Sequence, residues 1–280
     1  MQDPLTHFDH LPPLREGLAT HGLMANKGFG QHFLLDLNIT RKIVKLADLP
    51  PDLTVIEVGP GPGGLTRALL ENGSRVIAIE KDERFRPLLK ELADAANGRL
   101  TLIFDDALKV DEKGLLDGLP AAVVSNLPYN IGTALLIKWL TGPFRPDSLT
   151  LMFQREVVDR IVAGANDDAY GRLAVLAAAT ASARKVMDVP AQAFTPPPKV
   201  TSAVVRLVPT DSPLPTELLD ALQRVTAAAF GQRRKMLRSS LKAIGGESLC
   251  QAAGLSADRR AETIDLAGFL SLAQALSDRA

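Results

Sequence analysis

The chain has 280 residues, of which 46% are hydrophobic and 23% charged, and this balance is typical of a folded globular protein. Lysine plus arginine and aspartate plus glutamate each total 32, so the global basic charge common in nucleic-acid binders is absent and a basic face would have to be local. The single cysteine, Cys250, excludes a disulfide framework, and all four histidines lie at or before His32, which argues against a metal site and a Ser-His-Asp triad.

Short apolar strands alternate with helical segments in the first half of the chain. A helix is expected over residues 36–47, with Asp36 as its N-cap and Ile39 and Ile43 on its apolar face. Leucine spacing indicates another helix between residues 80 and 99. Strands are expected at residues 53–58, 75–80, 99–104, 121–125 and 148–154. This alternation predicts an α/β fold whose parallel sheet carries helices on both faces.

The pattern changes after residue 154. Helices are expected at residues 154–164 and 172–181, followed by strands at residues 185–190 and 202–209. No helix fits between these two strands, so we expect them to pair in antiparallel fashion. A proline-rich linker follows, and the remaining residues predict helices only, which places a domain boundary near residue 210.

A glycine-rich turn at residues 59–64, called here the glycine turn, directly follows the strand at residues 53–58. Glycine has no Cβ, so at Gly59 and Gly61 the backbone can approach a ligand closely. Glu80 ends the next strand, at a spacing that suits a carboxylate accepting hydrogen bonds from ribose hydroxyls. The pattern predicts a nucleoside-containing cofactor, with a purely structural turn as the alternative.

The prolines of the glycine turn bear on which cofactor this is. Pro60 and Pro62 remove two backbone N–H groups that a pyrophosphate would use. S-adenosylmethionine has no phosphate, so the prolines favour it modestly over NAD. Asp106, just after the third strand, is a candidate acceptor for the amino group of the cofactor's adenine, with a solvated loop acid or a helix N-cap as the alternative.

The tetrapeptide at residues 126–129, called here the asparagine corner, follows the fourth strand. At the carboxyl end of that strand it would lie beside the glycine turn. The side-chain carbonyl of Asn126 and the backbone carbonyl of Leu127 or Pro128 could each accept one hydrogen of an adenine amine. The nitrogen would then approach tetrahedral geometry and expose its lone pair, and Tyr129 would offer an aromatic face to the ring. The alternative is an ordinary type I turn.

Seven motifs follow one another along most of the chain. They are residues 27–34 (KGFGQHFL), 58–61 (VGPG), Glu80, 106–107 (DA), 126–131 (NLPYNI), 154–157 (QREV) and 194–202 (FTPPPKVTS). In this order they resemble the ribosomal RNA adenine dimethyltransferase family, from about residue 26 to the C-terminus. The resemblance implies a class I methyltransferase fold, which is a Rossmann-like seven-stranded sheet with its last strand antiparallel and a small C-terminal helical domain.

The resemblance also divides the chain into three parts. Residues 1–25 would be an N-terminal extension, residues 26–210 the S-adenosylmethionine-binding methyltransferase domain and residues 211–280 the helical domain. Residues 1–23 lie outside the resemblance, and we expect them to form a mobile extension.

Individual site residues follow from the family's pattern as well. The residues at cofactor-contact positions are His32, Leu34, Gly59, Glu80, Asp106 and Asn126. The family commonly has asparagine at the position of His32. Phe194 matches an aromatic residue that holds the target base opposite Tyr129, and the alternative is a core aromatic between strands.

The implied reaction is the transfer of two methyl groups from S-adenosylmethionine to each of two adjacent adenosines near the 3′ end of small-subunit rRNA. The implied partner is a pre-30S particle. We expect a monomer that uses no metal. We also expect it in the cytoplasm with no membrane partner, because the sequence has neither a signal peptide nor an apolar run of roughly 18 residues.

Three other functions stay open. Large-subunit rRNA methylation is disfavoured by the long C-terminal region with its FGQRRK segment at residues 230–235. A non-catalytic assembly factor would not need the intact cofactor motifs. An NAD-dependent oxidoreductase would need hydride-transfer residues, and none is evident.

Residues 221–243, called here the basic segment, contain six basic residues and no acid. The spacing of Arg234, Lys235, Arg238 and Lys242 predicts charges on neighbouring turns of one helix. We predict an RNA phosphate-binding face, and the alternative is a solvated helix face. Its residues would be Arg233, Arg234, Lys235, Arg238 and Lys242.

Overall fold

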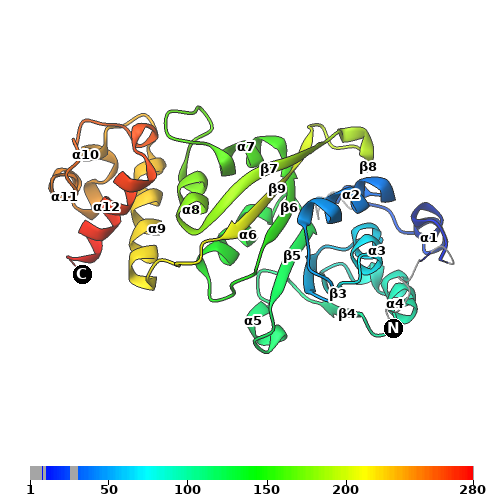
Figure 1. The fold of residues 1–280 in the computed structure, drawn as a ribbon. Helices are drawn as coiled ribbons and strands as arrows, with labels where there is room; N and C mark the ends of the chain where they lie inside the picture. The colour runs from blue at the N-terminus through cyan, green and yellow to red at the C-terminus, as the bar shows by residue number, and fades with distance from the viewer. Residues whose placement is uncertain (1–7, 9–10, 26–30, 280) are drawn as a thin grey trace. The chain divides into compact units, whose positions relative to one another are not determined.

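The computed structural model describes residue 8 and residues 11–25 and 31–279, so the start of the KGFGQHFL motif, residues 27–30, lies outside the described residues. A seven-stranded sheet has the strand order β4-β3-β2-β5-β6-β9-β7 (Figure 1). The strands are β2 (Thr54–Val58), β3 (Arg75–Glu80), β4 (Leu100–Phe104), β5 (Ala121–Asn126), β6 (Leu149–Gln154), β7 (Ala181–Val189) and β9 (Ser202–Pro209).

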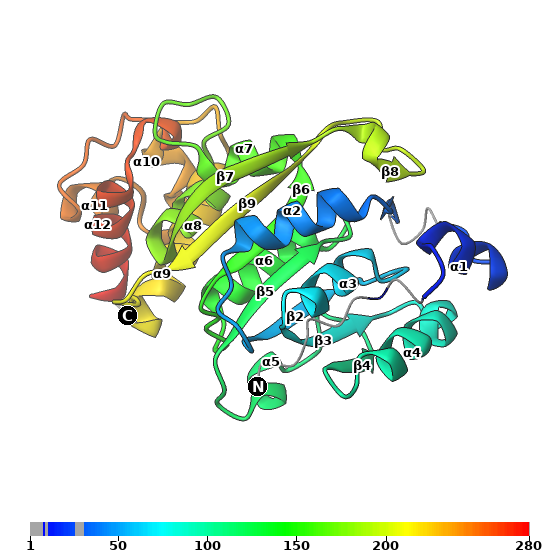
Figure 2. The same cartoon turned by 45° about the vertical axis from the view of Figure 1, so that its right-hand side comes forward.

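Strand directions match the expected fold class. The five strands β2 to β6 run parallel to their neighbours, and β9 runs antiparallel to β6. β7 lies beyond β9 and runs in the opposite direction to it, as Figure 2 shows. The predicted antiparallel pairing of the last two strands is therefore confirmed. All five strands predicted before residue 155 are present, with ends that differ by one residue at most.

The helices beside the sheet follow from the apolar pattern. They are α2 (Leu37–Ala47), α3 (Gly64–Glu71), a 3-10 turn (Glu83–Phe85), α4 (Arg86–Ala95), α5 (Glu112–Leu116) and α6 (Gly132–Thr141). The side chain of Asp36 accepts a hydrogen bond from Asn38 N and caps α2, as predicted. α2 and α3 lie across the near face of the sheet in Figure 2. Their apolar stripes pack with Val55, Val76 and Val124 in one buried cluster.

Residues 11–25 of the N-terminal segment are folded, whereas we expected a mobile extension over residues 1–23. Residues Leu14–Thr20 form α1, with Leu14, Gly17 and Leu18 buried. A Cβ on Gly17 would lie 3.0 Å from Leu88 of α4, which shows how closely the two helices approach. The guanidinium of Arg67 donates a hydrogen bond to Pro12 O at 3.1 Å. Apolar packing and this bond hold the segment, and neither is visible in a local motif.

A short two-stranded sheet joins distant parts of the chain. β1 (Phe33–Leu34) pairs antiparallel with β8 (Phe194–Thr195), so that Leu34 lies opposite Phe194. A 3-10 turn (Ala191–Ala193) precedes β8. The pairing fixes the segment that carries His32 against the loop between β7 and β9.

The chain forms two compact units, residues 1–155 with 185–208 and residues 156–184 with 209–280. The second unit contains α7 (Arg155–Val162), α8 (Arg172–Thr180), α9 (Thr216–Gly231), α10 (Leu237–Ser240), α11 (Gly246–Ala252), α12 (Leu266–Ser277) and 3-10 turns (Lys242–Ile244, Ala261–Thr263). The first residue of α7, Arg155, belongs to the first unit. It has its own core, in which Phe230 stacks on Phe269 with ring centroids 5.4 Å apart. Residues 156–184 thus group with the C-terminal helices, whereas the sequence placed its division near residue 210. None of the helices in the described residues is long and apolar enough to cross a membrane.

The basic segment is not the single helix that its spacing predicts. α9 ends at Gly231, and residues 232–235 form a turn. Arg238 lies in the short α10, and Lys242 begins a 3-10 turn. The helix breaks because Met236 pairs with Arg260 in a β-bridge and Leu237 N donates to Arg259 O. These are tertiary bonds, which a local charge pattern cannot indicate.

Candidate functional site

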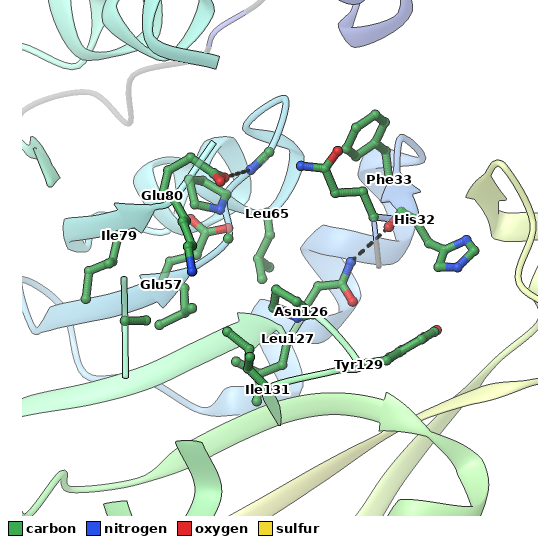
Figure 3. A pocket seen from close by; sticks show the side chains of 18 of the residues that line it. His32, Phe33, Glu57, Leu65, Ile79, Glu80, Asn126, Leu127, Tyr129 and Ile131 are labelled. Atoms are coloured by element: carbon green, nitrogen blue, oxygen red, sulfur yellow. Dashed lines mark hydrogen bonds between the residues drawn. The ribbon is translucent and has the colours of Figure 1, made fainter. Parts of the chain in front are cut away.

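A pocket lies at the carboxyl ends of β2, β3, β4 and β5, within the first unit (Figure 3). Its empty space, counted together with the open mouth, is about 1050 Å³. The predicted cofactor residues that line it are His32, Leu34, Gly59, Gly61, Glu80, Asp106 and Asn126. Leu127, Pro128 and Tyr129 of the asparagine corner line the same pocket. The structure thus brings together the glycine turn and the corner that the sequence placed at one sheet edge.

The glycine turn needs glycine for two reasons. Gly59, Gly61 and Gly63 have φ values of 69°, 52° and 84°, a region that side chains disfavour. Gly64 has ordinary φ but no room, because a Cβ there would lie 2.7 Å from Leu34 O. The turn therefore presents bare backbone to the pocket, as a cofactor held close to a strand end requires.

Glu80 is held by backbone donors at the end of β3. Its Oε2 accepts a hydrogen bond from Gly61 N at 3.1 Å, and its Oε1 accepts one from Asp82 N at 2.8 Å. Burial raises the pKa of Glu80, although these two hydrogen bonds act in the opposite direction. Each carboxylate oxygen can accept further hydrogen bonds, so Glu80 can also receive the hydroxyls of a ribose.

Asp106 lies in a tight turn after β4, at residues 105–110, called here the aspartate turn. Its side chain accepts hydrogen bonds from Leu108 N at 3.0 Å and from the ammonium of Lys81 at 2.9 Å. The Lys81 bond lowers the pKa of Asp106, so this group is a carboxylate at neutral pH. A charged acceptor at this edge suits the amino group of an adenine ring.

Sequence reasoning did not single out Glu57, which also lines the pocket. Its carboxyl group is buried within β2 and accepts a hydrogen bond from Thr66 Oγ1 at 2.7 Å. Burial raises the pKa of Glu57 to about 8. The signal was available, because a glutamate inside the apolar strand LTVIEV is unusual in a strand that is covered on both faces.

Asn126 is oriented by the segment that carries His32. Asn126 Nδ2 donates to His32 O at 3.4 Å (Figure 3). The amide nitrogen therefore faces the His32 backbone, and the side-chain carbonyl is left for another partner. His32 is held in turn, because its Nδ1 lies 2.8 Å from Pro196 O. A carbonyl oxygen only accepts, so this ring nitrogen carries the hydrogen.

The rest of the asparagine corner is fixed by three hydrogen bonds. Pro128 O accepts from Gly132 N at 3.0 Å and from Ile131 N at 3.2 Å, where α6 begins. The hydroxyl of Tyr129 is hydrogen-bonded to Ser202 Oγ at 2.7 Å, and burial raises the pKa of Tyr129. The Tyr129 ring lies 5.6 Å from the His32 ring between centroids. Tyr129 is thus a rigid, half-buried aromatic surface beside Asn126.

Phe194 lies elsewhere. Its side chain is 3% exposed and packs in the apolar cluster with Leu34, Ile43 and Val204. It is not one of the described residues that line the pocket. A role in holding the target base stays a prediction from the resemblance.

The predicted RNA-binding residues are all exposed, but they differ in their partners. The guanidinium of Arg233 contacts Asp168 O and lies 3.5 Å from Glu262 Oε2. Arg238 pairs with Asp258 at 2.6 Å. Among the described residues no ion pair is recorded for Arg234, Lys235 or Lys242. Residue 8 and residues 11–25 and 31–279, which the structure describes, contain no group of three or more side chains able to hold a metal.

Comparison with known proteins agrees with this geometry. Residues 22–278 match the family described as ribosomal RNA adenine dimethylase. "Ribosomal RNA small subunit methyltransferase A" of Phenylobacterium zucineum is 71% identical over 268 residues, which cover 96% of this chain and 94% of that protein. The protein of the same description from Rhizobium meliloti is 57% identical over 273 residues, 96% of this chain and 99% of that protein.

Two solved structures extend the comparison to the fold. A dimethyladenosine transferase from Plasmodium falciparum has a TM-score of 0.72 at 25% identity, over 86% of this chain and 96% of that one. The 23S rRNA methyltransferase ErmE has a TM-score of 0.66 at 26% identity, over 87% of this chain and 99% of that one. The fold is that of class I methyltransferases, and the chain belongs to the ribosomal RNA adenine dimethylase family.

Proposed function

We propose that this protein dimethylates the N6 amines of two adjacent adenosines near the 3′ end of small-subunit rRNA, with S-adenosylmethionine as the methyl donor. Family membership makes it an rRNA adenine methyltransferase, and the relatives at 71% and 57% identity are described as small-subunit enzymes. The observation that carries the proposal is the asparagine corner lining the same pocket as the glycine turn and Glu80.

The pocket residues fit S-adenosylmethionine. Glu80 would accept the ribose hydroxyls, and Asp106 would accept the adenine amino group. Gly59 and Gly61 allow close approach, and the segment with His32 and Leu34 lines the same pocket. Among the described lining residues Lys81 is the only lysine or arginine, and it is paired with Asp106, which suits a cofactor without phosphate. When bound, S-adenosylmethionine supplies a methyl group on an electrophilic, positively charged sulfur.

The asparagine corner activates the target amine by accepting its hydrogens. Asn126 donates its own N–H to His32 O, so its side-chain carbonyl accepts one hydrogen of the adenine N6 amine. Pro128 O already accepts two N–H groups of α6, which leaves Leu127 O as the backbone acceptor for the second hydrogen. The nitrogen lone pair would then be free to take the methyl group as the methyl–sulfur bond breaks. The methylated amine would lose one proton to solvent, and catalysis would rest on positioning without a general base.

Tyr129 holds the target adenine, which must leave its stack for the amine to be reached. Its hydroxyl is fixed by Ser202, so the ring presents a face at low entropic cost. The resemblance to the family implies that Phe194 supports the opposite face of the adenine ring. A monomethylated amine keeps one N–H for one acceptor, so a second transfer requires that the pocket admit the first methyl group.

Exposed cations of the basic segment would bind rRNA phosphates within a pre-30S particle. Arg234, Lys235 and Lys242 carry this role most directly, because Arg233 and Arg238 also pair with acids. We propose that the protein acts in the cytoplasm as a monomer and without a metal.

Methylation of large-subunit rRNA is the second candidate, favoured by the 0.66 TM-score to ErmE. A non-catalytic assembly role is the third, and it would leave the oriented Asn126 amide without a purpose.

Replacing Asn126 by alanine tests the catalytic assignment. Removing one acceptor of the reacting amine should lower kcat on small-subunit particles by roughly 10²- to 10³-fold, as loss of a fixed polar group at a reacting centre does. Affinity for S-adenosylmethionine, measured by calorimetry, should fall much less. Asn38→Ala, which changes an exposed asparagine of α2, is the control. Near-normal turnover by Asn126→Ala would contradict the assignment.

A further inference from the structure

Lys138, on α6, is hydrogen-bonded to the aspartate turn, which forms part of the pocket wall. Its ammonium donates to Ala107 O at 3.0 Å and to Val110 O at 2.6 Å, both in the aspartate turn. The third donor goes to the carboxylate of Glu112, at 2.9 Å. An ammonium group has three N–H donors, so this lysine is saturated by acceptors from the residues just after β4.

Glu112 makes this arrangement rigid. Its side chain is 2% exposed, and its Oε1 also accepts a hydrogen bond from Trp139 Nε1 at 2.7 Å. Trp139 is 1% exposed and belongs to the same helix as Lys138. A buried carboxylate is tolerated only when it is paired and hydrogen-bonded, and here both partners come from consecutive positions of α6.

The same helix begins at the asparagine corner. Gly132 N and Ile131 N donate to Pro128 O, so the start of α6 is hydrogen-bonded to the asparagine corner. Its fourth residue from the end, Lys138, fixes the aspartate turn, whose Asp106 and Ala107 line the pocket. One helix thus contacts two walls of the pocket, the wall that would accept the target amine and the wall that would accept the cofactor's adenine.

We propose that Lys138, Glu112 and Trp139 are positioning residues for cofactor binding, which hold the aspartate turn at a fixed place relative to the asparagine corner. None of the three is among the described residues that line the pocket, so they act through Asp106 and the backbone beside it. The inference rests on the proposed assignment of Asp106 to the adenine end of the cofactor.

Lys138→Met tests the proposal, because it removes the three donors and keeps the apolar stem. Affinity for S-adenosylmethionine and for S-adenosylhomocysteine should fall by the same factor, on the order of tenfold, since both carry the adenine that the turn meets. The value of kcat at saturating cofactor should change by less than about threefold, because the asparagine corner is untouched. Lys113→Met removes an exposed lysine of the adjoining α5 and is the matched control.

A double-mutant cycle separates positioning from general stability. In an Asp106→Ala background, Lys138→Met should cost little further cofactor affinity, because the group through which it acts is gone. Fully additive losses would overturn the proposal, as would unchanged affinity in Lys138→Met. If that variant fails to fold, Glu112→Gln and Trp139→Phe each weaken the network and retain the bulk of the side chain, and the same affinity loss is expected.

Failure of this inference is distinguishable from failure of the proposed function. Wild-type protein that binds no S-adenosylmethionine would reject the proposed function. Wild-type binding with equal binding by Lys138→Met, Glu112→Gln and Trp139→Phe would reject the positioning role alone.

Discussion

The pocket of the first unit and the basic segment of the second hold their ionisable side chains in different surroundings. Among the described residues four acids line the pocket, of which Glu57 and Glu80 are buried. Glu80 accepts hydrogen bonds from two backbone N–H groups, and Glu57 accepts one from Thr66. The basic segment is exposed, and Arg233 and Arg238 contact acids of their own unit. Buried polar groups act through geometry and are costly to disturb, whereas exposed charges are screened and individually weak.

This contrast sets the expected size of mutational effects. Changes that reach the buried frame of the pocket should be severe and insensitive to salt. Changes in the basic segment should be modest, and they should depend on ionic strength.

The largest effect on stability is expected for Phe194→Ala. The side chain is 3% exposed within the core cluster, and removing a buried phenylalanine costs about 3–5 kcal/mol. Chemical denaturation would measure the free energy of unfolding, and a loss below about 1 kcal/mol would contradict the buried position.

Phe194→Leu sharpens the same test, because it retains most of the apolar volume. If Phe194 also holds the target base, as the resemblance implies, the leucine variant should lose turnover out of proportion to its loss of stability. A fully active leucine variant would assign Phe194 to the core alone.

Gly64→Ala should come next. The new Cβ would lie 2.7 Å from Leu34 O and 3.1 Å from Leu14 Cδ1, so β1 or the glycine turn must move. We expect affinity for S-adenosylmethionine to fall by about tenfold or more, because misplacement of a positioning element is costly. Gly231→Ala, where a Cβ meets nothing within 4 Å, is the control. Equal cofactor affinity of the two variants would show that this close approach is unimportant.

Glu57 should give a smaller effect with a defined pH dependence. Burial raises its pKa from 4.5 to about 8, so between these values the folded protein binds more protons than the unfolded one. The free energy of unfolding should therefore fall as pH rises through this window, by at most about 1.4 kcal/mol per pH unit.

Glu57→Gln should flatten this pH dependence, and Glu16→Gln, at an exposed position of α1, should not. Urea denaturation at several pH values between 5 and 8.5 measures it. Parallel pH profiles for the wild type and Glu57→Gln would show that Glu57 titrates normally.

The smallest effect belongs to the double variant Arg234→Ala/Lys235→Ala. Affinity for small-subunit rRNA should fall several-fold, and the slope of log affinity against log salt should become shallower by about one per lost phosphate contact. Lys42→Ala/Lys45→Ala, in α2 of the other unit, removes the same charge. Unchanged salt dependence in the Arg234/Lys235 variant would leave the basic segment as a solvated surface.

The elements that sequence predicts well are those in which local pattern and environment agree. Runs such as residues 121–125 are apolar because both faces of the sheet are covered, and the strand ends therefore locate the glycine turn, Glu80 and Asn126. What sequence could not predict depends on contacts between distant residues. Pairing of Leu34 with Phe194, packing of α1 on α4 and the β-bridge at Met236 are of this kind.

The orientation of Asn126 belongs to the same class. The sequence left open whether Leu127 or Pro128 supplies the backbone acceptor, and that choice depends on the hydrogen bonds that α6 makes as it begins. Glu57 was visible in the sequence as a charged residue in an apolar strand, but its contact with Thr66 was not.

The central claim is that the pocket and the asparagine corner together methylate adenine amines. Its most direct test is to incubate the purified protein with S-adenosylmethionine and small-subunit particles that lack the modification, and to analyse the 3′ fragment of the rRNA by mass spectrometry. We predict N6,N6-dimethyladenosine at two adjacent positions with the wild type and almost none with Asn126→Ala. Absence of methyl transfer by the wild type, or transfer to large-subunit rRNA instead, would contradict the account.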